Sequence, residues 1–216
     1  MEVGKRFALL QCAEDPEHVT ERYGGYLQVY MAMLAEEGEE WALFRVYRGE
    51  FPAEDEIDSF DGFVITASSA NAHDNDAWIC NLLSLVRRLD SMKKKVLGLC
   101  FGHQILGRAI GGKTGRSATG WDIGVTTVNF SQSSELLNSL KMPPFLDVLE
   151  FHQDEIKELP AEAEILAWSE KTGIEMFKYG DHMMGIQSHP EYTKDIVLGH
   201  IHRLAKRNLI QVHKHI

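Results

Sequence analysis

The segment best suited to chemistry is Gly98-Leu99-Cys100-Phe101-Gly102, in which a cysteine has a glycine two residues away on each side. It follows a short apolar run and precedes a stretch of helical period. A nucleophile at such a strand-to-helix corner sits at the sheet edge where α/β proteins bind ligands, and the glycines leave room for the sharp turn. The start of the helix favours the thiolate, the form that attacks carbonyl carbons. We therefore predict that Cys100 is a nucleophile and not a cysteine that only fills space.

A thiolate nucleophile needs a base, and His189 is the best candidate among ten histidines. The residue before a proline is driven to an extended conformation, so that side chains two residues apart, here His189 and Glu191, project to the same side. Glu191 can then orient the imidazole and stabilise the imidazolium, as the third member of a triad does. The predicted catalytic residues are Cys100, His189 and Glu191.

The remaining cysteines and histidines form no second reactive pattern. Cys12 and Cys80 are far apart, and no Cys-x-x-Cys pair occurs, so we predict structural roles and neither a disulfide framework nor a zinc site. Side chains two apart on a helix do not meet, and no third ligand has suitable spacing, so we expect no metal and no other cofactor. The histidines considered for this were His103, His152, His200, His202, His213 and His215. The glycines around Lys113 also lack the order of a phosphate-binding loop.

The elements that must position these residues alternate between short β-rich runs and longer segments of helical period. This pattern is typical of an α/β fold with a mostly parallel sheet covered by helices on both faces. Short connections between the later strands predict added hairpins, and no repeat or linker marks a boundary, so we predict one domain over residues 1–216. Asp74 or Asp76 is the expected start signal of the longest helix. Strands are predicted at 7–11, 41–47, 62–66, 96–100, 121–130, 145–152, 165–169, 174–179 and 184–188, and helices at 26–35, 74–94, 104–110 and 195–207.

Composition narrows the class of protein and its partners. The chain has 216 residues, of which 44% are hydrophobic and 25% charged, as in ordinary globular proteins. Its net charge of −10 repels phosphate backbones and anionic lipids, so we expect neither nucleic acid nor membrane as a partner. The amino terminus lacks the apolar core of a signal peptide, and no apolar run approaches the ~20 residues that cross a bilayer. Three separated cysteines fit a reducing compartment, and we expect the cytosol.

Two of these motifs resemble a known family. The run 98–104, Gly-Leu-Cys-Phe-Gly-His-Gln, followed downstream by Ser188-His189-Pro190-Glu191, is similar to the nucleophile and His/Glu motifs of the class I glutamine amidotransferases. Residues 61–69 resemble the oxyanion strand of that family, and His152-Gln153-Asp154 resembles its His-x-Asp turn. The resemblance covers most of the chain and implies a flavodoxin-like three-layer sandwich with a Cys-His-Glu triad.

The resemblance also implies roles for residues around the triad. Amidotransferases usually have Gly-Gly-Pro or a close relative after the third strand, whereas this chain has Ala67-Ser68-Ser69. An oxyanion hole needs backbone N–H donors about 3 Å from the developing charge, and we expect these from Phe101 and from Ser68 or Ala67. Gln104 falls where the family places a glutamine near the α-amino and carboxylate groups of the substrate, and it is the predicted substrate-binding residue.

Within this superfamily, residues 61–66 and 71–79 look most like the plant γ-glutamyl peptidases, which are associated with glutathione conjugates in sulfur-containing defence metabolism. The resemblance implies a cysteine hydrolase that cleaves the γ-glutamyl bond of glutathione or its S-conjugates through a thioester and releases glutamate, in glucosinolate-type metabolism. One alternative is a glutaminase subunit that delivers ammonia to a separate synthetase. Another is a binding or regulatory module with an idle triad. The expected binding partner is a small γ-glutamyl peptide, and the chain could form a homo-oligomer. In the first alternative, it would instead assemble with a synthetase subunit.

Overall fold

The computed structural model describes residues 4–208 and 210, which form two compact units. One unit holds Met1–Glu14 and Glu36–His189, and the other holds Asp15–Ala35 and Pro190–Ile216. The first residues of the amino terminus, 1–3, and two histidines considered as metal ligands, His213 and His215, lie outside the described residues. Within the described part of the chain, no helix combines the length and apolar character needed to cross a membrane.

The first unit is built on a nine-stranded mixed sheet with the order β2-β1-β3-β4-β11-β10-β9-β6-β7, and β5 and β8 pair separately. The strands from β2 to β11 in this order are parallel, and the remaining pairings are antiparallel. The predicted α/β class and the added hairpins are confirmed. The strands are β1 Arg6–Gln11, β2 Glu40–Arg45, β3 Gly62–Ile65, β4 Lys95–Leu99, β5 Lys113–Arg116, β6 Asp122–Phe130, β7 Phe145–His152, β8 Asp154–Glu158, β9 Ala163–Trp168, β10 Met176–Tyr179 and β11 Met183–Ile186.

The inner parallel strands β1, β3 and β4 are short apolar runs, whereas β2 lies at the edge of the sheet. All four residues of β3 are buried, and so are the last four of β1. Successive side chains of a strand point to opposite sides, so burial at consecutive positions favours apolar residues throughout and explains why these runs do not alternate with polar residues. The carboxyl ends of neighbouring parallel strands meet at one edge, where the register pairs Leu99 of β4 with Ile186 of β11.

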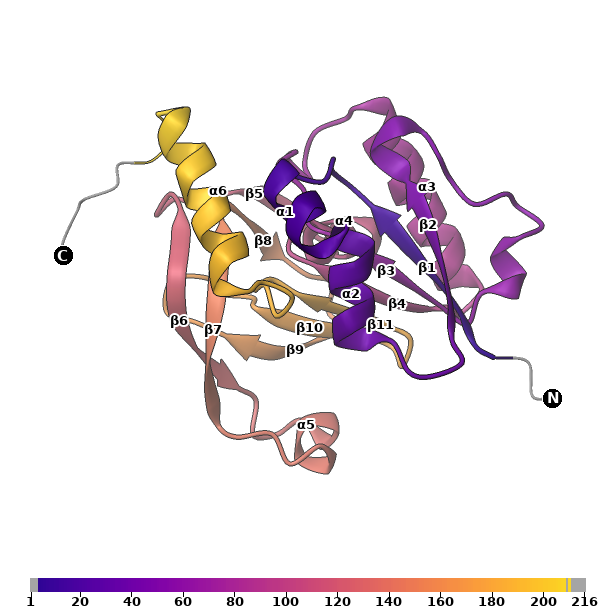
Figure 1. Cartoon of the computed structure of the whole chain (residues 1–216). Helices are drawn as coiled ribbons and strands as arrows, with labels where there is room; N and C mark the ends of the chain where they lie inside the picture. The colour runs from indigo at the N-terminus through magenta and orange to yellow at the C-terminus, as the bar shows by residue number, and fades with distance from the viewer. Residues whose placement is uncertain (1–3, 209, 211–216) are drawn as a thin grey trace. The chain divides into compact units, whose positions relative to one another are not determined.

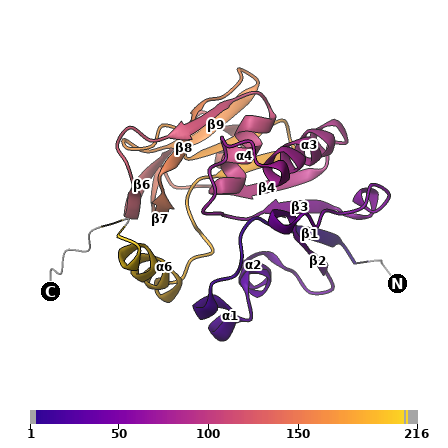
Figure 2. The same cartoon turned by 90° about the horizontal axis from the view of Figure 1, so that it is seen from above.

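Helices α3, Ala77–Ser91, and α4, Phe101–Ala109, lie side by side on one face of β3 and β4, as Figure 2 shows. The apolar side chains of α3 recur at helical spacing and pack into the same core as the strands. Trp78 of α3 stacks on Phe101 of α4 with 5.5 Å between ring centroids. Asp76 is the N-cap residue of α3, so the second of the two predicted start signals is the correct one, and the helix begins later than predicted.

The antiparallel end of the sheet has its own small core. Strands β6 and β7 form the outer pair in Figure 1, and the short helix α5, Glu135–Ser139, lies beyond their ends in the connection between them. Val128 and Phe130 of β6 pack with Leu137 of α5 and with buried residues of β9. This core therefore holds α5 against the ends of β6 and β9.

The described residues of the second unit form three helices, α1 Glu17–Tyr23, α2 Tyr26–Leu34 and α6 Lys194–Lys206. Its core is formed by Val19, Val29 and Ile196, one from each helix. Tyrosine hydroxyls tie the helices together: Tyr23 bonds to Thr193 at 2.8 Å and Tyr26 to His200 at 2.8 Å. The predicted second helical layer on the sheet, like the single domain, stays a prediction.

Among the described residues, two helices and two strands were not predicted, namely α1, α5, β5 and β8, and neither were the 3-10 turns Val46–Arg48 and Ile57–Ser59. The sequence of β5, Lys-Thr-Gly-Arg, has no apolar pattern, because this strand has no fully buried residue and pairs only with β8. The predicted strand 41–47 ends at Arg45, where a 3-10 turn, Val46–Arg48, replaces its last residues. The prediction that the nucleophile helix begins at Gln104 is wrong, since α4 begins at Phe101, directly after the cysteine.

Candidate active site

Cys100 lies at a sharp corner between β4 and α4. Strand β4 ends at Leu99 and α4 begins at Phe101, so a single residue makes the whole turn. Cys100 has φ 51° and ψ −103°, a conformation that an L-residue with a side chain rarely adopts. Such a residue costs on the order of 1–3 kcal/mol and is characteristic of functional sites. This is the backbone expected of a nucleophile corner.

The glycines on either side of Cys100 are required by close backbone contacts. A Cβ atom on Gly98 would lie 2.5 Å from the carbonyl carbon and oxygen of Gly102. A Cβ atom on Gly102 would lie 2.3 Å from the backbone oxygen of Ile65 in β3. Both distances are far inside van der Waals contact, so neither position has room for a side chain. The two glycines let α4 begin close against β3 and β4.

Cys100 and His189 follow the paired ends of two neighbouring parallel strands. The backbone N–H of Cys100 donates to the carbonyl oxygen of Ile186, the last residue of β11, at 2.8 Å. His189 follows three residues later, and its N–H donates to the carbonyl oxygen of Leu149 in β7 at 2.9 Å. The exposed fractions are 5% for Cys100 and 2% for His189. Strand pairing therefore brings the predicted nucleophile and base to the same edge of the sheet.

Glu191 belongs to the second unit, although only one residue separates it from His189. Its carboxylate is buried and accepts a hydrogen bond from the Tyr30 hydroxyl of α2 at 3.4 Å. Burial and a hydrogen-bond donor suit a carboxylate that orients a partner. Contact between Glu191 and His189, and with it the complete triad, stays a prediction.

The loop after β3 is held by the side chain of Ser68. Its hydroxyl donates to the backbone oxygen of Cys12 at 2.8 Å and accepts from the N–H of Ala70 at 3.1 Å. The preceding Thr66 is tied to the same segment, because its Oγ1 accepts from the N–H of Cys12 at 3.0 Å. Burial raises the pKa of the Cys12 thiol far above its ordinary value, which keeps it protonated and fits its predicted structural role. The loop with Ala67 is thus fixed without the glycine and proline that amidotransferases usually have there.

Gln104 lies in the first turns of α4 and is 3% exposed. Its Nε2 donates to the backbone oxygen of Asp154 at 2.7 Å and to Oε1 of Gln187 at 3.0 Å. The nucleophile helix is thereby tied to the start of β8 and to the segment after β11. Because Nε2 already makes two hydrogen bonds, only the side-chain oxygen of Gln104 could contact a substrate. That contact stays a prediction.

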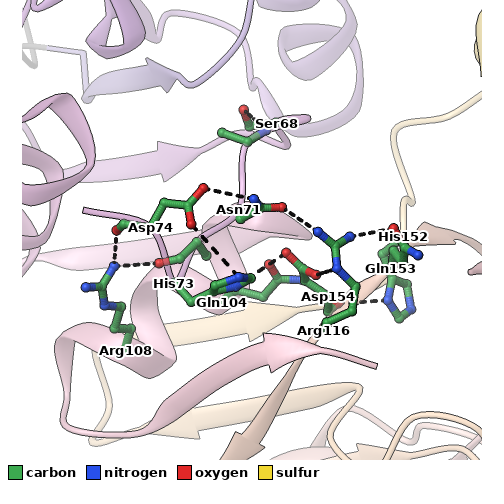
Figure 3. Close-up of polar contacts among 12 residues, drawn as sticks. Ser68, Asn71, His73, Asp74, Gln104, Arg108, Arg116, His152, Gln153 and Asp154 are labelled. Carbon is green, nitrogen blue, oxygen red and sulfur yellow. Dashed lines mark hydrogen bonds and ion pairs between the residues drawn. The ribbon is translucent and has the colours of Figure 1, made fainter. Parts of the chain in front are cut away.

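Two arginines that were not predicted hold the loop from Asn71 to Asn75, and Figure 3 shows their contacts. Arg108 of α4 donates to the backbone oxygens of Ala72 at 2.8 Å and Asp74 at 2.6 Å. Its second terminal nitrogen donates to Oδ1 of Asn75 at 2.6 Å. The nucleophile helix therefore anchors this loop through one guanidinium.

Arg116 of β5 holds the same loop from another side (Figure 3). Its guanidinium donates to Oδ1 of Asn71 at 2.9 Å and pairs with the buried carboxylate of Asp154, 3.1 Å from Oδ1. It also donates to Gln153, in the turn that the sequence analysis singled out. His73 lies 3.6 Å from the other oxygen of Asp154. The only sequence signals for this network were the 152–154 turn and the 71–79 segment, since Arg116 itself lies in an unpredicted strand.

Comparison with known proteins agrees with these observations. The family model of the class-I glutamine amidotransferases matches residues 18–197. Gamma-glutamyl peptidase 5 of Arabidopsis thaliana is 45% identical over 96% of this chain and 84% of that relative, and gamma-glutamyl peptidase 3 of the same plant is 44% identical over 98% and 86%. The crystal structure of a glutamine amidotransferase from Thermotoga maritima is similar with a TM-score of 0.76. The match covers 97% of this chain and 87% of the Thermotoga chain, and the two sequences are 20% identical.

Proposed function

Because this chain belongs to the class I glutamine amidotransferase family, we propose that it is a cysteine hydrolase that cleaves the γ-glutamyl bond of glutathione or of glutathione S-conjugates. The observation that carries the proposal is the corner at Cys100, with its positive φ and its two sterically required glycines. It occurs in a chain that is 44–45% identical to gamma-glutamyl peptidases over nearly its full length.

In the first step, the Cys100 thiolate attacks the γ-carbonyl carbon, and the electron pair of the carbonyl moves to its oxygen. The N–H of Phe101, at the start of α4, and an N–H of the Ala67-Ser68 loop stabilise that oxyanion. The C–N bond then breaks, and the leaving amine takes a proton from the His189 imidazolium. The product is a γ-glutamyl thioester on Cys100 and a released Cys-Gly peptide or its S-conjugate.

In the second step, His189 removes a proton from water, and the hydroxide attacks the thioester carbon. The C–S bond breaks, glutamate leaves, and the thiolate is restored. In this proposal Glu191 stabilises the imidazolium and holds its tautomer. The side-chain oxygen of Gln104 accepts from the α-ammonium of the γ-glutamyl group, since its Nε2 already donates to two protein oxygens.

The substrate assignment separates this proposal from its alternative, a glutaminase subunit that passes ammonia to a synthetase. Both share the thioester, and they differ in the leaving group, an amine of a peptide or ammonia. We favour the peptide because two relatives named gamma-glutamyl peptidases match nearly the whole chain. A role in sulfur-containing defence metabolism of the glucosinolate type, in the cytosol and without a synthetase partner, is part of the same proposal.

Glutamate release by the purified protein tests the proposal. The substrates are glutamine, glutathione and S-benzylglutathione, and the variants are Cys100→Ala and, as a matched control, the exposed Cys80→Ala on α3. We expect release from glutathione or its conjugate, a loss of at least about 1000-fold in Cys100→Ala, and no change in Cys80→Ala. Release from glutamine alone would favour the glutaminase, and release from no substrate would favour the idle module.

A further inference from the structure

Two carboxylates and one imidazole form a buried group in the first unit. Glu150 and His152 lie on β7, and Glu175 lies one residue before β10. One ligand atom from each of the three lies within 4.8 Å of the other two, and their exposed fractions are 1%, 4% and 2%. We propose that these side chains bind a divalent metal ion, Zn²⁺ or Mn²⁺, as a structural site linked to the nucleophile helix.

His152 presents a free lone pair to this group. Its Nδ1 lies 3.0 Å from the backbone oxygen of Asp154, and because a carbonyl oxygen only accepts, Nδ1 carries the hydrogen. In the neutral ring Nε2 is then an acceptor, and it lies 3.2 Å from Oε2 of Glu150, outside hydrogen-bond geometry. Two acceptors at this distance repel one another unless a cation lies between them. A histidine that donates one nitrogen to a carbonyl and offers the other is typical of a metal ligand.

The two carboxylates also need a positive charge. None of the four carboxylate oxygens of Glu150 and Glu175 makes a hydrogen bond of ordinary geometry within the described residues, although Ser169 lies near Glu175, and all four oxygens are buried. A divalent ion neutralises both carboxylates at once.

The donor set selects the class of ion. Two carboxylate oxygens and one imidazole nitrogen suit Zn²⁺, and the oxygen-rich set also suits Mn²⁺. With metal–ligand distances of about 2.1 Å, neighbouring ligand atoms lie roughly 3–3.4 Å apart. The 3.2 Å between His152 and Glu150 already has that value. The backbone of Glu175 is fixed on both sides, because its N–H donates to Ala167 at 3.0 Å and its oxygen accepts from Gln187 at 2.8 Å. The adjustment that brings its carboxylate to a bound ion is therefore left to its side chain.

The link to the nucleophile helix is the backbone oxygen of Asp154. It accepts from His152 and from Nε2 of Gln104 on α4. A metal that fixes the His152 ring therefore fixes the turn at 152–154 and, through it, the first turns of α4. The chain spacing could not reveal this group, because Glu175 comes from a different strand connection than the other two ligands.

Metal binding is measured on the whole chain carrying Cys100→Ala, so that a catalytic thiolate does not bind the added ion and the result does not depend on activity. The protein is stripped with a chelator, dialysed against Zn²⁺ or Mn²⁺, and analysed for bound metal and for thermal unfolding. Two ligand variants, Glu175→Gln and Glu150→Gln, keep the side-chain shape and remove one charge each. Glu162→Gln, an exposed acid before β9, is the matched control.

We expect one equivalent of Zn²⁺ or Mn²⁺, an unfolding temperature that rises on binding, and a loss of at least tenfold in affinity in either ligand variant but not in Glu162→Gln. With Co²⁺ as a spectroscopic substitute, the visible absorption bands should change in the ligand variants. The proposal is wrong if neither ion binds stoichiometrically. It is equally wrong if both ligand variants, folded by circular dichroism, bind the metal as tightly as the Cys100→Ala parent.

Discussion

Acid should destabilise this protein through one buried histidine, His103. This residue of α4 is fully buried, and its ring packs against Phe177 with 5.2 Å between centroids. Burial lowers the pKa of His103 to about 3, because the imidazolium form loses its hydration in the core. The ordinary pKa of a histidine is about 6.5, so the folded protein disfavours the imidazolium by roughly 3.5 pKa units. At 1.36 kcal/mol per unit, this corresponds to roughly 5 kcal/mol.

The free energy of unfolding depends on pH because the folded and unfolded chains bind a proton at His103 in different pH ranges. Between pH 3 and pH 6.5 the unfolded chain binds a proton at His103 and the folded chain does not, so the free energy of unfolding rises with pH over this range. The contribution is complete above about pH 6.5 and is lost as the pH falls toward 3. Below pH 6 this one group should give a slope of about 1.4 kcal/mol per pH unit.

Urea unfolding followed by tryptophan fluorescence at pH 7, 6, 5 and 4 measures this slope. His103→Gln removes the titrating group, so its free energy of unfolding should fall less steeply with acid than that of the natural chain. His202→Gln, which removes an exposed histidine of α6, is the matched control and should keep the natural slope. Parallel curves for the natural chain and His103→Gln would refute the reasoning.

Further predictions concern the corner and the loops around it. Gly102→Ala places a Cβ 2.3 Å from the backbone oxygen of Ile65, so we expect 1–3 kcal/mol or more of destabilisation in urea unfolding, whereas Gly115→Ala, with open space at its Cβ, should change stability by less than about 0.5 kcal/mol. Ser68→Ala removes both hydrogen bonds by which the Ser68 hydroxyl holds the loop after β3, the loop that we propose to supply an oxyanion donor. We expect glutamate release to slow about tenfold in kcat, with no change in the far-ultraviolet circular dichroism spectrum. Arg116→Met leaves the buried Asp154 carboxylate without its arginine, and we expect a loss of roughly 1–3 kcal/mol in thermal unfolding, which a conservative Arg116→Lys recovers only in part.

The central part of the fold could be predicted because its signals are local. Strand 145–152 has the predicted bounds in the structure, and the apolar runs of β1, β3 and β4 are buried as their composition indicates. The Cys100 corner was also readable, since the need for a glycine on each side follows from the turn itself. Burial of a strand and the geometry of a turn are reflected in the residue types next to them in sequence. These residue types were sufficient to predict the central strands and the corner.

The surroundings of the site could not be predicted because they depend on contacts that are distant in sequence. Arg116 meets Asn71 across 45 positions, and Gln104 meets Asp154 across 50. Arg116 lies in a polar strand with no periodic pattern, so nothing near it in the chain indicates a partner. The buried group around Glu175 could not be predicted for the same reason, because β7 and the segment before β10 must come together before the ligands meet.

The position of the predicted nucleophile and base is a property of the sheet and not of the loops. Cys100 is strained, and the bond from its N–H to Ile186 continues the pairing of β4 with β11 by one residue. The same pairing directs the chain after Ile186 toward His189, whose N–H is held in turn by β7. A strained residue persists only where its surroundings determine it, and here parallel strands and two glycines do so. Glu191 lies in the other unit, where Tyr30 binds it. It follows that the sheet sets where the thiol and the imidazole lie, while the helical unit holds the carboxylate that we assign to orienting the ring.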